Sequence, residues 1–191
     1  MVEFDPIFAT PERIKIVFLG NANVGKTSII NRWMFGQYNN RITPTIGIAQ
    51  VQKTVNHDGT NLNVIVCDTA GEERYQSLCG NFLRGADCVI IVASYDIPSS
   101  CEAINSWCDL VKDKCEAETG IVIAINKKDT LSDPPIIHND EYEVFSISAL
   151  TGDTINEVFM EAIQQGYQSH CTTSLKKTTP IPKKNEKKCS C

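Results

Sequence analysis

Gly20-Asn21-Ala22-Asn23-Val24-Gly25-Lys26-Thr27 is the most informative stretch of this chain. It fits the pattern G-x-x-x-x-G-K-S/T, and it stands between a short β-branched run at 14–19 and a helix-like segment that extends to about residue 35. Glycines let the backbone approach phosphate oxygens, so that successive N–H groups and the helix N-terminus face the anion. The stretch therefore predicts a phosphate-binding loop, and not a glycine turn that carries a surface lysine.

The side chains at the end of this loop have distinct expected roles. Lys26 is expected to reach the β- and γ-phosphates and to contribute to catalysis, and the hydroxyl of Thr27 is expected to coordinate Mg²⁺. The neighbouring residues of the predicted nucleotide site are Asn23, Val24, Gly25 and Ser28. The loop predicts a nucleotide site without saying which base is bound.

The rest of the chain alternates between strand-like and helix-like segments. Three continuous apolar runs of five residues are typical of strands buried on both faces. They span residues 63–67, 88–92 and 121–125. Helix-like stretches at 100–117 and 153–165 follow two of them, and residues 57–60 resemble a hairpin turn between segments 48–56 and 61–67. This alternation predicts an α/β fold, with a mostly parallel sheet and helices on both faces.

A second functional element, Asp68-Thr69-Ala70-Gly71, follows the first of these apolar runs. A carboxylate at the C-terminal end of a buried strand lies at the sheet edge where α/β proteins bind ligands. Asp68 is therefore expected to hold Mg²⁺ opposite Thr27. The backbone N–H of Gly71 is expected to approach the γ-phosphate, because no side chain intervenes.

A third element, Asn126-Lys127-Lys128-Asp129, identifies the base. The carboxylate of Asp129 is suited to accept hydrogen bonds from N1–H and N2–H₂ of guanine, whereas adenine has no donors in that arrangement. Asn126 belongs to the same predicted site, and the aliphatic stem of Lys127 is expected to lie over the ring. Ser148-Ala149-Leu150 is expected to close the pocket with a backbone N–H to guanine O6.

The amino-acid composition excludes several classes of protein. The chain has 191 residues with 18 basic and 23 acidic side chains, a net charge of −5, and its hydrophobic fraction of 42% is typical of a globular domain. No apolar run is long enough to span a bilayer, and the first residues carry no recognisable secretory signal. Nine cysteines without a CxxC pair favour a reduced, cytosolic compartment. These features argue against a secreted disulfide scaffold and against a membrane-spanning protein.

Positive charge is concentrated at the end of the chain. Residues 171–191 contain six lysines and a single acidic residue, with prolines and few apolar side chains. We therefore expect a nucleotide-binding domain over residues 1–168 and a disordered tail over residues 169–191.

Together these motifs resemble the Ras superfamily of small GTPases, and within it the Rab family. The matching residues include Glu73-Arg74-Tyr75, Arg84-Gly85-Ala86, Tyr95-Asp96-Ile97 and Trp107. The resemblance implies the P-loop small-GTPase fold with a six-stranded sheet, and switch segments near 37–48 and 69–83. It implies that Thr45 binds Mg²⁺ and the γ-phosphate, that Tyr38 stacks on guanine, and that GTP holds both switches in the active state.

The chain end, Cys189-Ser190-Cys191, resembles the Cys-x-Cys ending on which Rab proteins receive two geranylgeranyl groups. Two lipid chains suffice for stable anchoring, and the preceding lysines add attraction to anionic lipid. The resemblance implies a switch in vesicle trafficking on the cytoplasmic face of endomembranes, cycling with the cytosol. The implied partners are exchange factors, GTPase-activating proteins, a GDP-dissociation inhibitor or escort protein, and effectors, with no nucleic acid.

Several residues depart from the family pattern. Glu72 stands where a glutamine usually orients the attacking water, so it is the expected catalytic residue, but its charge leaves the effect on hydrolysis open. Gln50 and Cys67 replace two of the three usual effector-contacting aromatics, and Phe82 retains the third. Pro134-Pro135 predicts that the helix after Asp129 is truncated or absent.

Two other functions stay open at this stage. A guanine-nucleotide-dependent binding module with little or no hydrolysis would follow if Glu72 cannot replace glutamine. An adenine-specific phosphotransferase is opposed by Asp129.

Overall fold

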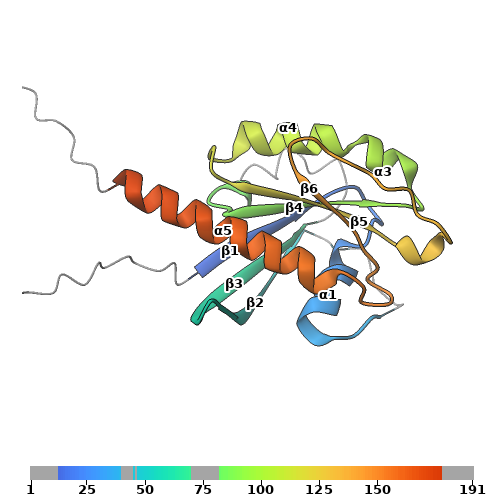
Figure 1. Ribbon diagram of the computed structural model, residues 1–191, viewed down its shortest axis with the longest axis horizontal. Coiled ribbons are helices and arrows are strands. Elements are labelled where there is room, and N and C mark those ends of the chain that lie inside the picture. The colour runs from blue at the N-terminus through green and yellow to red at the C-terminus, as the bar shows by residue number, and fades with distance from the viewer. Residues whose placement is uncertain (1–12, 40–44, 46, 70–81, 178–191) are drawn as a thin grey trace, which may run out of the picture.

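The computed structural model describes residues 13–39, 45, 47–69 and 82–177. Within these residues six strands form one sheet, in the order β2-β3-β1-β4-β5-β6 (Figure 1). The strands are β1 (Arg13–Leu19), β2 (Ile48–His57), β3 (Thr60–Thr69), β4 (Cys88–Ser94), β5 (Gly120–Asn126) and β6 (Glu143–Ser146). Strand β2 pairs antiparallel with β3, and every other neighbouring pair is parallel. The predicted α/β small-GTPase fold with a mostly parallel sheet is confirmed.

Helices cover both faces of the sheet. They are α1 (Lys26–Phe35), α3 (Pro98–Glu102), α4 (Ile104–Lys114) and α5 (Ile155–Lys177), with a short 3₁₀ helix, η2 (Lys128–Thr130). Helices α1 and α5 pack on one face and α3 and α4 on the other, as Figure 1 shows. On the first face, the Trp33 ring of α1 stacks on Phe159 of α5 with a centroid distance of 4.0 Å.

The alternation of side chains along the central strands explains their continuous apolar sequence. In β4, Ile90 and Val92 contribute to the core beneath α1 and α5, whereas Val89, Ile91 and Ala93 contribute to the core beneath α3 and α4. Both sets are buried. A strand with helices on both faces needs apolar residues at every position. The continuous apolar run at 88–92 predicted such a strand for this reason.

The β2–β3 connection is the tight hairpin that the sequence predicted. Asp58 and Gly59 occupy its two turn positions with φ of 49° and 82°. Two consecutive positive φ values characterise a two-residue turn whose twist suits a hairpin, and Asp-Gly is among the sequences that favour it.

The prediction of one helix-like stretch over residues 100–117 is wrong in its division. The segment forms two helices, α3 and α4, with Ala103 between them. Hydrogen bonding continues through the junction, from Ala103 N to Ser99 O at 3.2 Å and from Trp107 N to Ala103 O at 3.1 Å. The first helix is held on the end of β4, where the hydroxyl of Ser100 accepts the Ser94 N–H at 2.9 Å. The segment is thus divided at Ala103, although no proline or glycine interrupts it.

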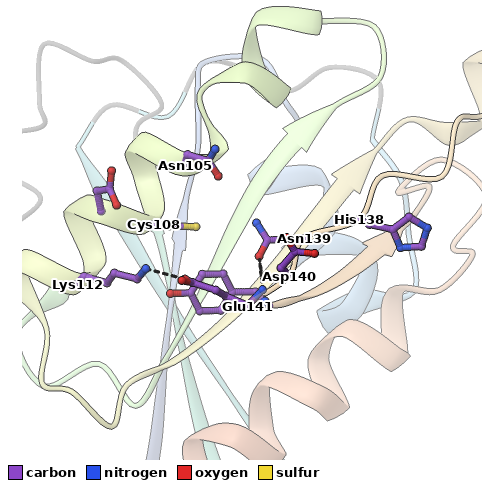
Figure 2. A pocket seen from close by; sticks show the side chains of 9 residues that line it. Asn105, Cys108, Lys112, His138, Asn139, Asp140 and Glu141 are labelled. Carbon is purple, nitrogen blue, oxygen red and sulfur yellow. Dashed lines mark hydrogen bonds and ion pairs between the residues drawn. The ribbon is translucent and has the colours of Figure 1, made fainter.

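The absence of a full helix after Asp129 is confirmed: η2 has three residues, and residues 131–142 contain no helix. This segment is ordered in another way, because the Asn139 Oδ1 accepts the N–H groups of Glu141 and Tyr142 at 2.9 and 3.0 Å. Glu141 also pairs with Lys112 of α4 at 2.6 Å. A cavity of about 570 Å³ lies between α4 and residues 138–142 (Figure 2), and none of the predicted site residues lines it.

Helix α5 extends to Lys177, past the boundary near residue 168 that composition suggested. The His170 side chain of this helix pairs with Asp87 at 2.8 Å, which holds the extension against the start of β4. Cys189 and Cys191 lie outside the described residues. Of the helices that the structure describes, none combines the length and apolar character needed to cross a bilayer.

Candidate functional site

The predicted phosphate loop, residues 20–27, joins β1 to α1, and two glycines are required by its close packing. A Cβ at Gly20 would lie 2.1 Å from the carbonyl oxygen of Val92, and a Cβ at Gly25 would lie 2.4 Å from Nδ2 of Asn126. Both glycines also have positive φ, at 136° and 96°. A side chain at either position would displace β4 or the base-recognition segment.

Lys26 begins α1 and is buried, with 5% of its surface exposed. Its ammonium group donates hydrogen bonds to the carbonyl oxygens of Gly20 and Asn21, at 2.8 and 2.9 Å. The side chain therefore folds back across the loop, and its charge lies where the loop backbone surrounds a phosphate in this motif. The geometry suits the predicted role of Lys26 in binding the β- and γ-phosphates.

The three predicted metal ligands lie together. The hydroxyl of Thr27 donates to Asp68 Oδ2 at 2.6 Å, and the Thr45 hydroxyl lies 2.9 Å from Thr27 Oγ1 and 3.4 Å from the same carboxylate oxygen. They come from α1, from β3 and from the segment before β2. All three offer oxygen, the donor that Mg²⁺ prefers.

The second carboxylate oxygen of Asp68 provides a test of this metal assignment. Asp68 Oδ1 is buried and has no hydrogen-bond partner among the described residues. Burial raises the pKa of Asp68, although the hydrogen bond from Thr27 and the charge of Lys26 oppose the rise. A buried carboxylate oxygen without a donor is stabilised by a bound cation, so these residues fit Mg²⁺.

This arrangement predicts opposite effects of Asp68→Asn with and without metal. In EDTA the variant is expected to be more stable than wild type, because it removes a buried charge that burial disfavours. A gain of 1 kcal/mol would raise the melting temperature by about 2–4 °C in a domain of this size. Added Mg²⁺ should then stabilise wild type and leave the variant unchanged.

Thermal unfolding with and without Mg²⁺ measures both effects. Asp58→Asn is the matched control, because Asp58 is an exposed carboxylate in the β2–β3 turn. A variant that is less stable than wild type in EDTA, yet equally stabilised by Mg²⁺, would contradict the assignment.

Asn126, at the end of β5, connects the phosphate loop to the predicted base pocket. Its Nδ2 donates to the carbonyl oxygen of Val24 at 2.9 Å, and its Oδ1 accepts the N–H of Ala149 at 3.0 Å. Asn126 is buried, so both bonds are shielded from water. The side chain acts as a brace between two loops, and Ala149 N–H, one of the candidates for guanine O6, is already engaged.

Lys127 is held over the phosphate loop by two contacts. Its φ is 64°, and its ammonium group donates to Asn23 O and to Asp96 Oδ2, both at 2.8 Å. Burial raises the pKa of Asp96, but the hydrogen bonds from Lys127 and Ser94 outweigh it and hold that pKa below its usual value. Asp96 is therefore a positioning residue to which sequence reasoning gave no role, although Tyr95-Asp96-Ile97 had drawn attention to it.

Asp129 lies beside the loop that was expected to close the pocket. Its Oδ1 accepts a hydrogen bond from the hydroxyl of Ser148, and that hydroxyl also accepts the N–H of Thr151 at 3.1 Å. Asp129 itself is exposed, so its carboxylate is accessible to a ligand. Leu150 and Tyr38 are also exposed, at 47% and 38%.

Most of the predicted residues are described, and those of the phosphate loop, the metal cluster and the base-recognition segments lie at the carboxyl ends of β1, β3, β5 and β6, whereas no hydrogen bond among the described residues joins Tyr38 to them. Ser28 is half-buried in the first turn of α1. Gly71 and Glu72 lie outside the described residues. Of the two changed effector positions, Gln50 is exposed on β2, and Cys67, its partner in the β2–β3 pairing, is buried.

Sequence reasoning missed a contact between α4 and the phosphate loop. The indole N–H of Trp107 on α4 donates to Asn21 Oδ1 at 2.8 Å. No motif predicts this bond, because 86 positions separate the two residues.

Comparison with known proteins identifies the family to which the chain is similar. A family model described as the Ras family matches residues 15–168. A Ras and EF-hand domain-containing protein homolog of Caenorhabditis elegans is 36% identical over 115 residues, which is 60% of this chain and 18% of that protein.

Two Ras-related proteins give similar matches. Rab-7b of Paramecium octaurelia is 39% identical over 95 residues, and RABG3c of Arabidopsis thaliana is 38% identical over 94 residues. These alignments cover 50% and 49% of this chain, and 46% of each relative. The matched region thus spans less than half the length of these curated relatives.

Proposed function

Because the chain belongs to the Ras family, we propose that it is a Rab-like small GTPase that binds GDP and GTP with Mg²⁺ and hydrolyses GTP slowly. The observation that carries the proposal is the convergence of Thr27, Thr45 and Asp68 beside the phosphate loop. Asn126 links that loop to the segment beside Asp129, so one site offers contacts for phosphates, metal and base.

The phosphate end of the site works by positioning and charge stabilisation. Lys26 neutralises charge on the β- and γ-phosphate oxygens, and the N–H groups of residues 23–28 fix their orientation. Thr27, Thr45 and Asp68 would hold Mg²⁺, which neutralises the charge that develops between the β- and γ-phosphates. The role of Glu72 would be to hold the attacking water.

Thr45 is the residue through which the site would respond to the presence of a γ-phosphate. Its hydroxyl contacts Thr27 and Asp68, so Thr45 lies against the same residues that would bind the metal. Hydrolysis removes the γ-phosphate that is proposed to hold Thr45 and Gly71, and thereby releases both segments. A partner that recognises the held segments would distinguish the GTP state from the GDP state.

The base end selects guanine. Asp129 would accept two hydrogen bonds from guanine, and the loop of residues 148–150 would close the pocket with a backbone N–H to O6. Lys127 lies between the phosphate loop and Asp96, where its stem can cover the ring. Tyr38 supplies the opposite aromatic wall.

The cellular role proposed from the family resemblance is a membrane-anchored switch in vesicle trafficking. Geranylgeranyl groups on Cys189 and Cys191 would anchor the chain to the cytoplasmic face of endomembranes, and a GDP-dissociation inhibitor or escort protein would return it to the cytosol. Exchange factors, GTPase-activating proteins and effectors would act on the two switch segments. Gln50, which is exposed on β2, would give this protein an effector surface that differs from the usual Rab surface, whereas Cys67 is buried and adds no exposed area.

Single-turnover hydrolysis of preloaded GTP tests the enzyme assignment. We expect wild type to turn over at about 10⁻⁴ s⁻¹ or faster, the slow intrinsic range of such GTPases. The Glu72→Gln variant, measured in parallel, reports how much the carboxylate contributes to this rate. Hydrolysis that is absent in wild type and restored by Glu72→Gln would instead favour a permanently loaded, nucleotide-dependent binding module.

A further inference from the structure

Arg32, in the last turn of α1, forms hydrogen bonds that its sequence position does not suggest. Its guanidinium donates to three backbone carbonyls: Nε to Ala149 O at 2.8 Å, Nη2 to Leu150 O, and Nη1 to Gly36 O at 2.9 Å. A guanidinium has five donors in a fixed planar fork, so one side chain can hold several carbonyls in a defined geometry.

These carbonyls belong to two separate walls of the proposed base pocket. Ala149 and Leu150 lie in the loop proposed to close the pocket, and Gly36 caps α1 two residues before Tyr38, the proposed stacking residue. The loop is also held from the other side, because Ala149 N–H donates to Asn126 Oδ1 at 3.0 Å. Asn126 and Arg32 therefore hold the same peptide segment between them.

We propose that Arg32 is a positioning residue that keeps the two walls of the base pocket together and thereby sets the residence time of guanine nucleotides. The inference rests on the proposed guanine-nucleotide binding. None of its three carbonyl partners belongs to the metal cluster of Thr27, Thr45 and Asp68, which is formed by other hydrogen bonds. The effect should therefore appear in nucleotide release and not in the response to Mg²⁺.

Arg32→Ala should accelerate release of fluorescently labelled GDP about tenfold, because charge-assisted bonds to two walls are lost together. Arg32→Lys should give an intermediate rate, since an ammonium retains the charge but not the planar fork. Release of IDP, which keeps O6 and lacks the 2-amino group, should accelerate by the same factor as release of GDP. Removal of Mg²⁺ should accelerate release from wild type and variant by equal factors.

Lys53→Ala is the matched control for a general weakening of α1. The Lys53 ammonium donates to Trp33 O at 2.9 Å and lies 4.5 Å from the centroid of the Trp33 ring. It thus supports the same last turn of α1 without touching the base pocket. We expect it to lower the melting temperature and to leave the GDP release rate unchanged.

The outcomes separate this inference from the proposed function. If wild type retains GDP and both Arg32 variants release it at the wild-type rate, the inference is overturned and the proposed function stands. Equal acceleration by Lys53→Ala would also overturn it, because the effect would then come from the stability of α1. If wild type does not bind GDP, the proposed function fails and the inference falls with it.

Discussion

Lys26→Ala is expected to lower the affinity for GDP and GTP at least about 100-fold. Each charge-assisted hydrogen bond lost is worth roughly 1.5–3 kcal/mol, and Lys26 is positioned to reach two phosphate groups. The side chain is buried and donates to Gly20 O and Asn21 O, so its truncation removes a charge held inside the loop.

Equilibrium titration with fluorescent GDP measures this loss. Lys128→Ala serves as control, because Lys128 lies close in the fold but pairs with Asp153 at 2.5 Å. Thermal unfolding of the nucleotide-free proteins verifies that Lys26→Ala is folded. A folded Lys26→Ala variant that binds GDP within threefold of wild type would overturn the assignment of residues 20–27 as the phosphate loop.

Asp129→Asn is expected to change the base preference of the site from guanine to xanthine. The affinity for GDP should fall about 100-fold or more, and the affinity for XDP should rise. The carboxylate accepts two donors from guanine, whereas an amide presents one acceptor and one donor. Xanthine offers N1–H and O2, which match the amide, and a site left with unpaired polar groups rejects the wrong base strongly. The amide oxygen of this variant would still be able to accept the bond from the Ser148 hydroxyl, so the pocket should keep its shape.

Competition between GDP, XDP and ATP for both proteins measures this exchange. Asp153→Asn is the control, since Asp153 is an exposed carboxylate in the following turn. Unchanged preference for GDP in Asp129→Asn would show that Asp129 does not recognise the base. ATP that competes with GTP at similar affinity for wild type would restore the adenine-specific alternative.

Much of the fold was predictable from local pattern. The apolar runs at 63–67, 88–92 and 121–125 all fall within strands, and Asp58-Gly59 forms the expected turn. Pro134 and Pro135 correctly indicated that no full helix follows Asp129. These predictions succeeded because strand burial, turn geometry and proline sterics depend on residues that are neighbours in the chain.

The prediction for residues 100–117 failed for the opposite reason. Helical composition continues through Ala103, so nothing local marks the boundary between α3 and α4. The two helices make different tertiary contacts, because Ser100 of α3 bonds to the end of β4 and Trp107 of α4 bonds to Asn21 in the phosphate loop. Composition also underestimated the extent of α5, which is held near its end by the pair of His170 with Asp87.

The amino-acid sequence by itself determined the chemistry of the candidate site, because each motif places its functional groups within a few covalently linked residues. Lys26 and Thr27 are adjacent, and Asn126 and Asp129 lie three positions apart. Tertiary structure alone decided how these motifs support one another. The bond from Arg32 to Ala149 joins residues 117 positions apart, and the bond from Asn126 to Val24 joins residues 102 positions apart. Such contacts exist only after the sheet has brought the carboxyl ends of its strands together, and no local spacing encodes them.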